Sequence, residues 1–321
     1  MPLKIGARAS ELARWQADWV AARLRDAGVE VELVPISTTG DRRREAIEAI
    51  GGQGVFTKEI QHALLAGRID LAVHSLKDLP TAAVPGLVLA AVPARGPCGD
   101  VLVSAGGASL DQLPAGARVG TGSPRRRAQL LHRRRDLQVS PVRGNVDTRL
   151  RKLRDNEFDA VVLAEAGLVR LELAERITQR LPVDVMLPAP GQGALGLEIR
   201  DDDDATRQVV AVLDNAETHS AVLAERTLLA ALQGGCLAPV AALARVENTR
   251  LTLAGRVLDR DGSRLIEASD AAAPADAAQL GRRVADKLLA QGADELIHEA
   301  RGSIGRRVTR KQPRRQKGTE R

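Results

Sequence analysis

The chain has 321 residues, 44% of them hydrophobic, which is enough for two or three domains with buried cores. Its aromatic residues are only two Phe and two Trp, which argues against a protein that binds single-stranded nucleic acid by stacking. The net charge is +6, but residues 301–321 hold seven Arg and two Lys against one Glu, so the basic character belongs to the end of the chain.

The two cysteines, Cys98 and Cys236, are too few for a disulfide framework and lack metal-ligand spacing. The N-terminus shows no apolar signal segment. No apolar run reaches the roughly 18–20 residues that span a membrane. We therefore expect a cytoplasmic protein in a reducing compartment, without a metal site.

Strand and helix patterns alternate along the first 93 residues. Strands are predicted at 3–7, 29–36, 69–73 and 87–92, with helices from Ser10 to about residue 27 and from Thr57 to about residue 66. The compact apolar run at 69–73 is typical of a strand buried on both faces of a parallel sheet. This order predicts an α/β domain.

A second series follows a break at 93–99. Strands are predicted at 100–104, 118–121, 137–142 and 159–163, with helices at 124–135 and 147–156. Residues 187–200 are predicted to cross back and to end in a strand. The sequence thus predicts a second α/β unit.

The pattern changes after Asp214. A helix is predicted at 217–231, then strands at 240–246, 250–258 and 264–270, and a helix at 275–290. This order indicates a small α+β domain in which three antiparallel strands pack against helices. Residues 301–321 are polar and aperiodic, which predicts a disordered extension that solubilises the chain or binds polyanions weakly.

An arginine surplus marks residues 118–154, which hold eleven Arg and one Lys against two Asp. In the first strand-to-helix turn of this region, Ser123 is a good N-cap and Pro124 suits the first helical position. The free N–H groups there attract anions, and Arg125 and Arg126 would stand beside them. An ordinary cap with exposed arginines is the alternative.

A second turn of the same region repeats the pattern. Asp147 is the expected cap, flanked by Arg143 and Arg149. Neighbouring parallel strands end at the same edge of a sheet, where open α/β sheets bind ligands. Because arginine binds carboxylates and phosphates through paired hydrogen bonds, the two turns together predict a site for a polyanionic ligand.

Another candidate site is the sequence HSLKDLP, just past the predicted strand at 69–73. Lys77 and Asp78 could form a plain ion pair. Alternatively, Asp78 exchanges protons with a substrate, because a carboxylate whose pKa is tuned by its surroundings can stabilise a cation and shuttle a proton. His74 has no evident partner and is expected to be structural.

Two glycines precede Cys236 after a predicted helix, which indicates a flexible, exposed loop. A buried cysteine there would be an inert small hydrophobe. An exposed one would be reactive or modified. The residues alone leave both alternatives open.

Together these motifs resemble the porphobilinogen deaminase family. The resemblance spans roughly residues 3–300 and rests on the ordered set IGARASELARWQ, GGQGVFTKEI, AVHSLKDLP, VGTGSPRRRAQL, VRGNVDTRLRKL, FDAVVLAEAGL, LPAPGQGALGLEIR and GGCLAPVA. Each motif alone is modest evidence, whereas their common order and spacing are specific.

The resemblance implies a fold class of two α/β lobes like those of type II periplasmic binding proteins, plus a small α+β C-terminal domain with a three-stranded antiparallel sheet. It places domain 1 at 1–93 with 188–213, domain 2 at 99–187, domain 3 at 216–300 and the tail at 301–321. It also implies a monomeric transferase of tetrapyrrole (haem) biosynthesis. Such an enzyme condenses four porphobilinogen molecules head to tail with loss of ammonia and releases hydroxymethylbilane by hydrolysis.

The same resemblance assigns roles to single residues. Cys236 matches the cysteine that forms a thioether to a dipyrromethane cofactor, and Asp78 matches the catalytic carboxylate. Matches to cofactor-binding positions are Lys77, Asp78, Ser123, Arg125, Arg126, Arg143 and Gly144. Matches to substrate-binding positions are Arg8, Ser10, Phe56, Arg149 and Gln192.

The chain departs from the family's common pattern at Ala49 and Gln53, where many members have lysine. The arginines at 42–44 are a hypothetical replacement for that charge. Two rival functions are weighed against the resemblance. A non-enzymatic two-lobed protein that binds an anionic metabolite would explain the arginines but not Cys236 or a third domain. Nucleic-acid binding through 118–154 and the tail would show steep salt dependence.

Overall fold

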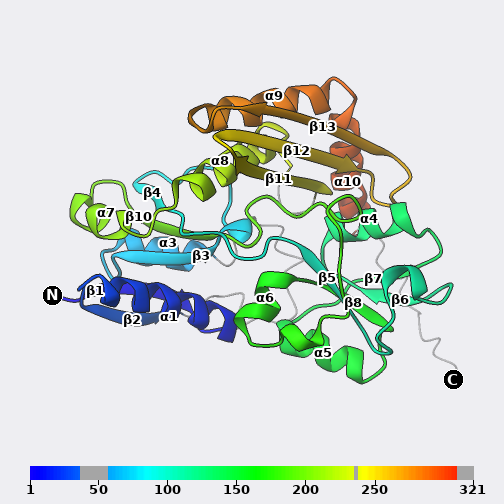
Figure 1. Cartoon of the computed structure of the whole chain (residues 1–321), viewed down its shortest axis with the longest axis horizontal. Helices are drawn as coiled ribbons and strands as arrows, with labels where there is room; N and C mark the ends of the chain where they lie inside the picture. Colours follow the sequence, from blue (N-terminus) through cyan, green and yellow to red (C-terminus); the bar gives the residue numbers. More distant parts are fainter. Residues whose placement is uncertain (37–56, 235–237, 309–321) are drawn as a thin grey trace, which may run out of the picture.

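The computed structural model describes residues 1–36, 57–234 and 238–308, with the backbone alone for 301–308. Three sheets organise this part of the chain, two of five strands and one of three. Figure 1 shows the two larger sheets side by side, with the small sheet and its helices above both of them. The expected fold class, two α/β lobes and a small α+β unit, is confirmed.

The first lobe is built on a sheet with the strand order β2-β1-β3-β10-β4. Its strands are β1 (Leu3–Arg8), β2 (Val31–Ile36), β3 (Leu71–Ser75), β4 (Leu87–Ala91) and β10 (Leu195–Arg200), and its helices are α1 (Glu11–Asp26), α3 (Lys58–Leu65) and α7 (Asp204–Ala211). β1, β2 and β3 are parallel, whereas β10 is antiparallel to both β3 and β4. The sheet is therefore mixed, where the sequence predicts parallel neighbours for the buried strand.

The second lobe follows the same plan in the order β7-β6-β8-β5-β9. Its strands are β5 (Asp100–Ser104), β6 (Arg118–Gly120), β7 (Gln138–Ser140), β8 (Ala160–Ala164) and β9 (Gln179–Arg180); its helices are α4 (Pro124–Arg133), α5 (Val146–Arg154) and α6 (Glu165–Arg170), with short 3-10 turns η2 (Leu110–Gln112) and η3 (Ala174–Arg176). In each lobe the fourth strand is antiparallel to its neighbours and follows directly after the chain has crossed from the other lobe.

The third unit is an antiparallel sheet of β11 (Val240–Glu247), β12 (Arg250–Leu258) and β13 (Leu265–Ala272). Its helices are α8 (Ala216–Ala231), α9 (Ala277–Leu289) and α10 (Ala293–Val308), with a short turn η4 (Pro274–Asp276). Leu228 of α8, Leu253 of β12 and Leu280 of α9 are buried in the aliphatic core between the sheet and these helices. The order and the antiparallel pairing confirm the prediction for this region.

Some local expectations were wrong. Helix α5 begins after Asn145, whose side chain accepts a hydrogen bond from the N–H of Thr148 at 2.9 Å, so Asn145 and not Asp147 is the cap. Helix α10 continues to Val308, where the sequence predicts a disordered extension from residue 301. Residues 309–321 lie outside the described part. The domain boundaries given above stay a prediction.

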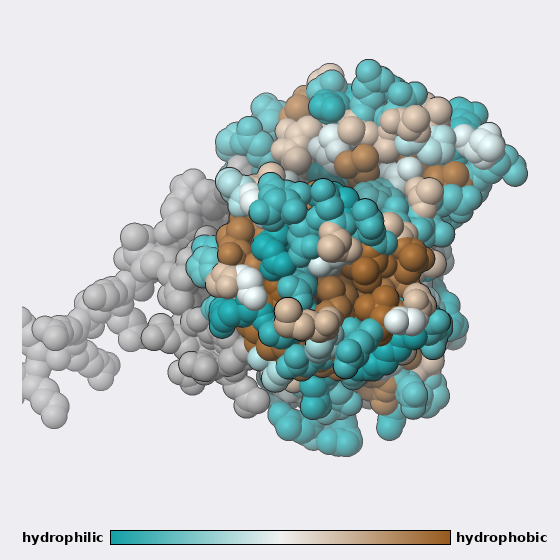
Figure 2. Space-filling view, turned by 90° about the vertical axis from the view of Figure 1, so that its left-hand side faces the viewer, coloured by the Kyte–Doolittle hydropathy of each residue, from teal (hydrophilic) through white to brown (hydrophobic). Residues whose placement is uncertain are grey.

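Seen from the side of the first lobe, the surface is mainly hydrophilic, with apolar residues gathered near the middle of this face (Figure 2). Large exposed apolar residues of this lobe include Leu33, Leu65 and Val212, which belong to separate parts of it. Isolated exposed apolar side chains are common on folded proteins and need no partner. Within the three described ranges, no helix is both long and apolar enough to cross a bilayer.

Candidate active site

Asp78 lies on a short 3-10 turn, η1 (Leu76–Asp78), at the carboxyl end of β3. Leu76 and Leu79 are buried in one cluster with Ala194 and Val222, and the N–H of Leu76 donates to the carbonyl of Ala194 at 3.0 Å. The two leucines anchor the turn, while Asp78 between them is exposed. Among the described residues no hydrogen bond holds the Asp78 carboxylate, so it is available to a ligand.

Lys77 is half-buried beside Asp78. Burial lowers the pKa of Lys77 to about 8, against the opposing attraction of Asp78. Repulsion from Arg126 and Arg125 lowers this pKa further, whereas Asp100 raises it. In the described part of the chain no ion pair joins the Lys77 ammonium to a carboxylate. The plain Lys77–Asp78 ion pair considered above is therefore not formed.

Arg125 and Arg126 lie in the first turn of helix α4, after the cap Ser123 and Pro124, as the sequence predicts. The Ser123 side chain accepts a hydrogen bond from the N–H of Arg126 at 3.4 Å. Both guanidinium groups are buried, at 4% and 5% exposure, and both hold the fully buried carboxylate of Asp100 at the start of β5. Nη1 of Arg125 donates to Oδ2 at 2.7 Å, and Nε of Arg126 donates to Oδ1 at 2.8 Å. The alternative of exposed arginines was wrong.

Further donors of the pair bind the backbone, because Nη1 of Arg125 also donates to the Leu187 carbonyl at 2.6 Å. Burial would raise the pKa of Asp100, but Arg125 and Arg126 outweigh it and hold this pKa at about 2. Two guanidinium groups thus share one carboxylate. One positive charge of this buried group is left uncompensated.

The second turn of the arginine-rich region opens at the same edge, because β6 and β7 are parallel neighbours. Gly144 has a φ of +107°, and a Cβ there would lie 2.6 Å from the Thr148 side chain, so only glycine fits. The Gly144 carbonyl accepts a hydrogen bond from Nε of Arg149 at 2.9 Å. Arg143 is exposed.

Arg149 lies within electrostatic range of both candidate motifs. Burial lowers its pKa, repulsion from Arg126 lowers it further, and attraction to Asp78 opposes both effects. The structure therefore brings together Lys77, Asp78, Arg126 and Arg149, although the sequence separates the two pairs widely. These residues form a cationic cluster with one exposed carboxylate in it.

The remaining predicted site residues that the structure describes belong to the first lobe and to the crossing segment. Arg8 is the last residue of β1, which pairs with β3, and Ser10 is the N-cap of α1 without a side-chain cap bond. Both are half-buried. Gln192 is 1% exposed, and its Nε2 donates to Oδ1 of Asp100 at 3.1 Å. Gln192 therefore supports the buried arginine pair.

Several predicted residues lie outside the described part: Phe56, Cys236, Ala49, Gln53 and the arginines at 42–44. Helix α8 leads toward Cys236, since it ends at Ala231 and the described chain continues to Gly234. No group of three or more His, Cys, Asp or Glu side chains suited to a metal ion occurs among the described residues.

Two acids that the sequence did not reveal as site residues, Asp100 and Glu225, are fully buried. Glu225 of α8 pairs with Arg95 at 2.7 Å and accepts hydrogen bonds from the N–H groups of Gly191 and Ala244 at 2.7 Å each. This ion pair ties both crossing segments to the third unit. An acid at the head of the apolar run DVLVS, near an arginine surplus, is the signal that could have revealed Asp100.

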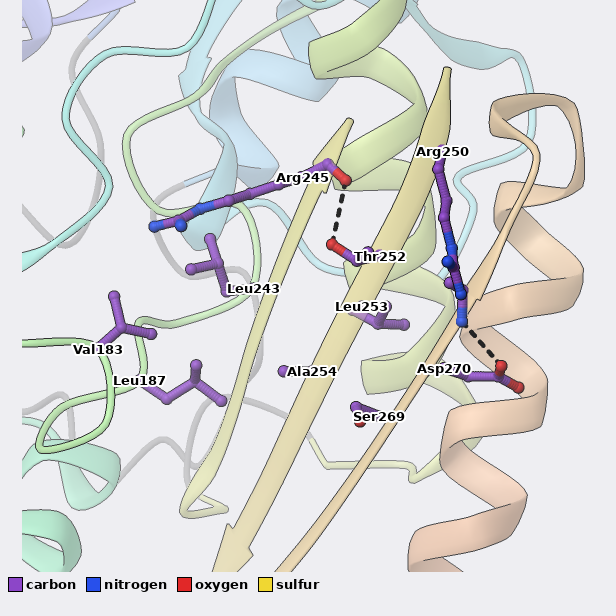
Figure 3. Close-up of a pocket in the computed structure, with 11 residues that line it drawn as sticks. Val183, Leu187, Leu243, Arg245, Arg250, Thr252, Leu253, Ala254, Ser269 and Asp270 are labelled. Carbon is purple, nitrogen blue, oxygen red and sulfur yellow. Dashed lines mark hydrogen bonds between the residues drawn. The ribbon is translucent and has the colours of Figure 1, made fainter. Parts of the chain in front are cut away.

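A pocket of about 440 Å³ lies on the face of the small sheet turned away from its helices (Figure 3). Val183 and Leu187 line one side of this pocket, and Leu243, Arg245 and Thr252 belong to the sheet. It shares no residue with the cationic cluster. Its lining residue Leu187 nevertheless accepts a hydrogen bond from Arg125 through its carbonyl.

Comparisons with known proteins agree across the chain. Residues 3–208 match the family model "porphobilinogen deaminase, dipyromethane cofactor binding domain", and residues 219–290 match "porphobilinogen deaminase, C-terminal domain". A porphobilinogen deaminase of Syntrophotalea carbinolica is 52% identical over 298 residues, covering 92% of this chain and 95% of that protein. One of Desulforudis audaxviator is 52% identical over 301 residues, covering 92% and 97%.

Two solved structures of binding proteins are similar to part of this chain. A periplasmic substrate-binding protein of an ABC transporter from Coxiella burnetii has a TM-score of 0.42 and 17% identity, covering 66% of this chain and 91% of its own. The methionine-binding protein MetQ has a TM-score of 0.40 and 15% identity, covering 65% and 89%.

Proposed function

This chain belongs to the porphobilinogen deaminase family, and from that premise we propose that Asp78 is its catalytic carboxylate and Cys236 its cofactor anchor. The protein is a transferase of tetrapyrrole biosynthesis. It condenses four porphobilinogen molecules head to tail with loss of ammonia and releases hydroxymethylbilane by hydrolysis. Its cofactor is dipyrromethane. The rival of a non-enzymatic binding protein is not favoured, because the family models cover both lobes and the C-terminal domain.

The observation that carries the site assignment is the charge balance around Asp78. Among the described residues, Lys77 lies within electrostatic range of Arg125, Arg126, Asp78 and Asp100, and Arg149 lies within range of Arg126 and Asp78. Four cations thus stand against two carboxylates. Buried or half-buried cations without enough counter-charge are costly unless an anion joins them. Each pyrrole of porphobilinogen and of dipyrromethane carries two carboxylates. The cluster therefore fits the cofactor and the substrate.

The cofactor, once bound through Cys236, supplies a pyrrole carbon as the nucleophile that is extended. Lys77, Arg143, Arg149 and the helix start at Ser123 hold the carboxylates of the cofactor and the growing chain. Arg125 and Arg126 contribute mainly charge, because Asp100 and backbone carbonyls already take several of their donors. Gly144 lets its turn pass close to Arg149. We assign substrate binding to Arg8, Ser10, Phe56, Arg149 and Gln192. Gln192 acts indirectly, through its hydrogen bond to Asp100.

Asp78 can do two things in this setting. Its exposed carboxylate stabilises the positive charge that develops on the substrate as ammonia leaves. It would then accept the proton that the nucleophilic pyrrole carbon loses once the new carbon–carbon bond has formed, because a carboxylate in contact with the reacting ring can serve as a general base. Lys77, the neighbour in sequence, cannot replace it, because a protonated ammonium has no free electron pair.

Intact mass and turnover test this assignment together. We expect purified protein to be heavier than its sequence by one dipyrromethane, and Cys236→Ser to lose that added mass. Asp78→Asn should keep the added mass and lose most turnover. Protein that lacks any adduct at Cys236 after exposure to porphobilinogen would refute the anchor, and full turnover by Asp78→Asn would refute the carboxylate.

We also propose that the enzyme works in the cytoplasm as a monomer. The support is the family membership, together with a composition that has only two cysteines. Size-exclusion chromatography with light scattering at micromolar concentration should give a mass near that of one chain. A dimer mass that persists on dilution would contradict this proposal.

A further inference from the structure

Helix α8 of the third unit presents Val222 and Arg226, one helical turn apart, to the turn that carries Asp78. Val222 belongs to the buried cluster that contains Leu76 and Leu79. The guanidinium of Arg226 donates from Nη1 to the carbonyl of Leu79 and from Nη2 to the carbonyl of Pro80, each at 2.8 Å. The rigid fork of an arginine thus holds two consecutive carbonyls, a geometry that a lysine cannot reproduce.

These two bonds act on backbone that has few bonds of its own. The turn η1 has three residues, and the N–H of Leu79 donates to the carbonyl of Leu76 at 3.2 Å. Pro80 has no N–H and restricts Leu79 to the extended conformation, which Leu79 adopts at ψ 120°. The position of Asp78 is therefore set largely from outside the turn, by β3, by Ala194 and by Arg226.

Burying the charged guanidinium of Arg226 is unfavourable, which indicates that this side chain has a specific structural task. Burial lowers the pKa of Arg226, and the buried Glu198 opposes that effect. No carboxylate forms an ion pair with Arg226 within the described ranges, so its hydrogen-bonding partners are the two carbonyls next to Asp78. The same helix ends at Ala231, five residues after Arg226, and the chain then continues toward Cys236.

We propose that Arg226 is a positioning residue, which fixes the turn bearing Asp78 against the helix that leads to the cofactor-bearing cysteine. This inference rests on the proposed role of Asp78. Arg226 acts through that residue and touches neither substrate nor cofactor. Its loss displaces the carboxylate relative to the reacting ring, and displacements of about 1 Å can cost around 100-fold in rate.

The test compares Arg226→Gln and Arg226→Lys, each alone and combined with Asp78→Asn. The control is Arg283→Gln, because Arg283 on α9 of the same unit also donates to a backbone carbonyl, that of Ala271 at 3.2 Å, in addition to its ion pair with Asp270 at 3.0 Å. Intact mass first establishes cofactor loading of each full-length variant. The rate of the first porphobilinogen addition is then measured under single-turnover conditions, together with kcat and KM.

We expect Arg226→Gln to keep its cofactor, to change KM less than about threefold and to lower the rate by about 10- to 100-fold. Arg226→Lys should recover part of this loss, and Arg283→Gln should stay within about twofold of wild type. In the Asp78→Asn background, Arg226→Gln should change the residual rate by less than about threefold, because coupled residues are not additive.

An unchanged rate for Arg226→Gln, a change in KM alone, a loss of cofactor, or an equal loss with and without Asp78 would each overturn the positioning role. If Arg226→Gln does not fold, Arg226→Lys, which keeps the charge and bulk, carries the same comparison. A normal rate for Asp78→Asn by itself would instead remove the proposed role of Asp78. The two failures are therefore distinguishable.

Discussion

Replacing Asp100 by Asn should be one of the most damaging single changes near the site. Asp100 is fully buried and accepts hydrogen bonds from Arg125 at 2.7 Å, Arg126 at 2.8 Å and Gln192 at 3.1 Å. Asn preserves the shape but removes the carboxylate that these two guanidinium groups share. Breaking a buried ion pair by removing one partner costs about 3–5 kcal/mol of unfolding free energy.

The pKa of Asp100 gives an independent magnitude. Its fall from the usual 3.8 to about 2 corresponds to about 2–3 kcal/mol in favour of the charged form, at 1.36 kcal/mol per pKa unit. This smaller figure refers to protonating the acid, which keeps some hydrogen bonds. The larger figure refers to the substitution by Asn. The NH2 group of its amide is a donor and would face the N–H donors of a guanidinium, so at least one hydrogen bond is lost together with the charge. We therefore expect a loss of about 3 kcal/mol or more at neutral pH.

Urea unfolding of the two proteins measures this loss. Because the folded pKa of Asp100 is depressed, its contribution is fully present above about pH 4 and fades as the pH falls toward 2. The difference between wild type and Asp100→Asn should therefore be constant from pH 5 to 8 and begin to close below pH 4. The control is Asp111→Asn, which breaks an exposed ion pair with Arg133 and should cost less than about 1 kcal/mol. An equal, small loss in both variants would refute the reasoning.

Three further predictions concern residues of the candidate site. In a Cys236→Ser background, Lys77→Met should raise the urea midpoint at pH 7, because the lowered pKa of Lys77 means that burying its charged ammonium destabilises the folded state. This gain in stability should shrink as the pH rises through about 8. A lower midpoint for Lys77→Met at pH 7 would contradict the prediction. Arg143→Ala should impair cofactor assembly or elongation while circular dichroism stays unchanged, and normal turnover would count against its role. Gly144→Ala should lower the unfolding free energy by about 1 kcal/mol or more, because φ is +107° and a Cβ would meet Thr148; urea unfolding no different from wild type would exclude that strain.

Local signals made much of the fold predictable. Ser123 and Pro124 mark a helix start in sequence and in structure, because a cap and a fixed φ act on adjacent residues. The apolar runs around β3, β5 and β8 identify buried strands. At the second arginine turn, Asn145 and Asp147 are both good caps two residues apart, and the local pattern does not decide between them.

Long-range contacts account for what the sequence analysis missed. The partners of Arg125 and Arg126 lie 25 and 26 residues back at Asp100, and Arg226 reaches carbonyls 146 and 147 residues away. No periodicity links such residues, because the contacts arise only when the sheets and α8 are in place. The antiparallel direction of β10 is likewise set by the crossing of the chain. The apolar run of β3 shows that the strand is buried, but it carries no information on the direction of the strand beside it.

The placement of β10 also orders events during translation. All five strands of the second lobe lie between residues 100 and 180, so that lobe is complete when its own segment has left the ribosome. The first lobe needs β10, at 195–200, between β3 and β4, so β4 has no strand beside it until then. The half of the enzyme that is synthesised first is thus the later one to finish folding. Nascent chains halted at a length where β9 has left the ribosome but β10 has not should protect the second lobe from protease before the first.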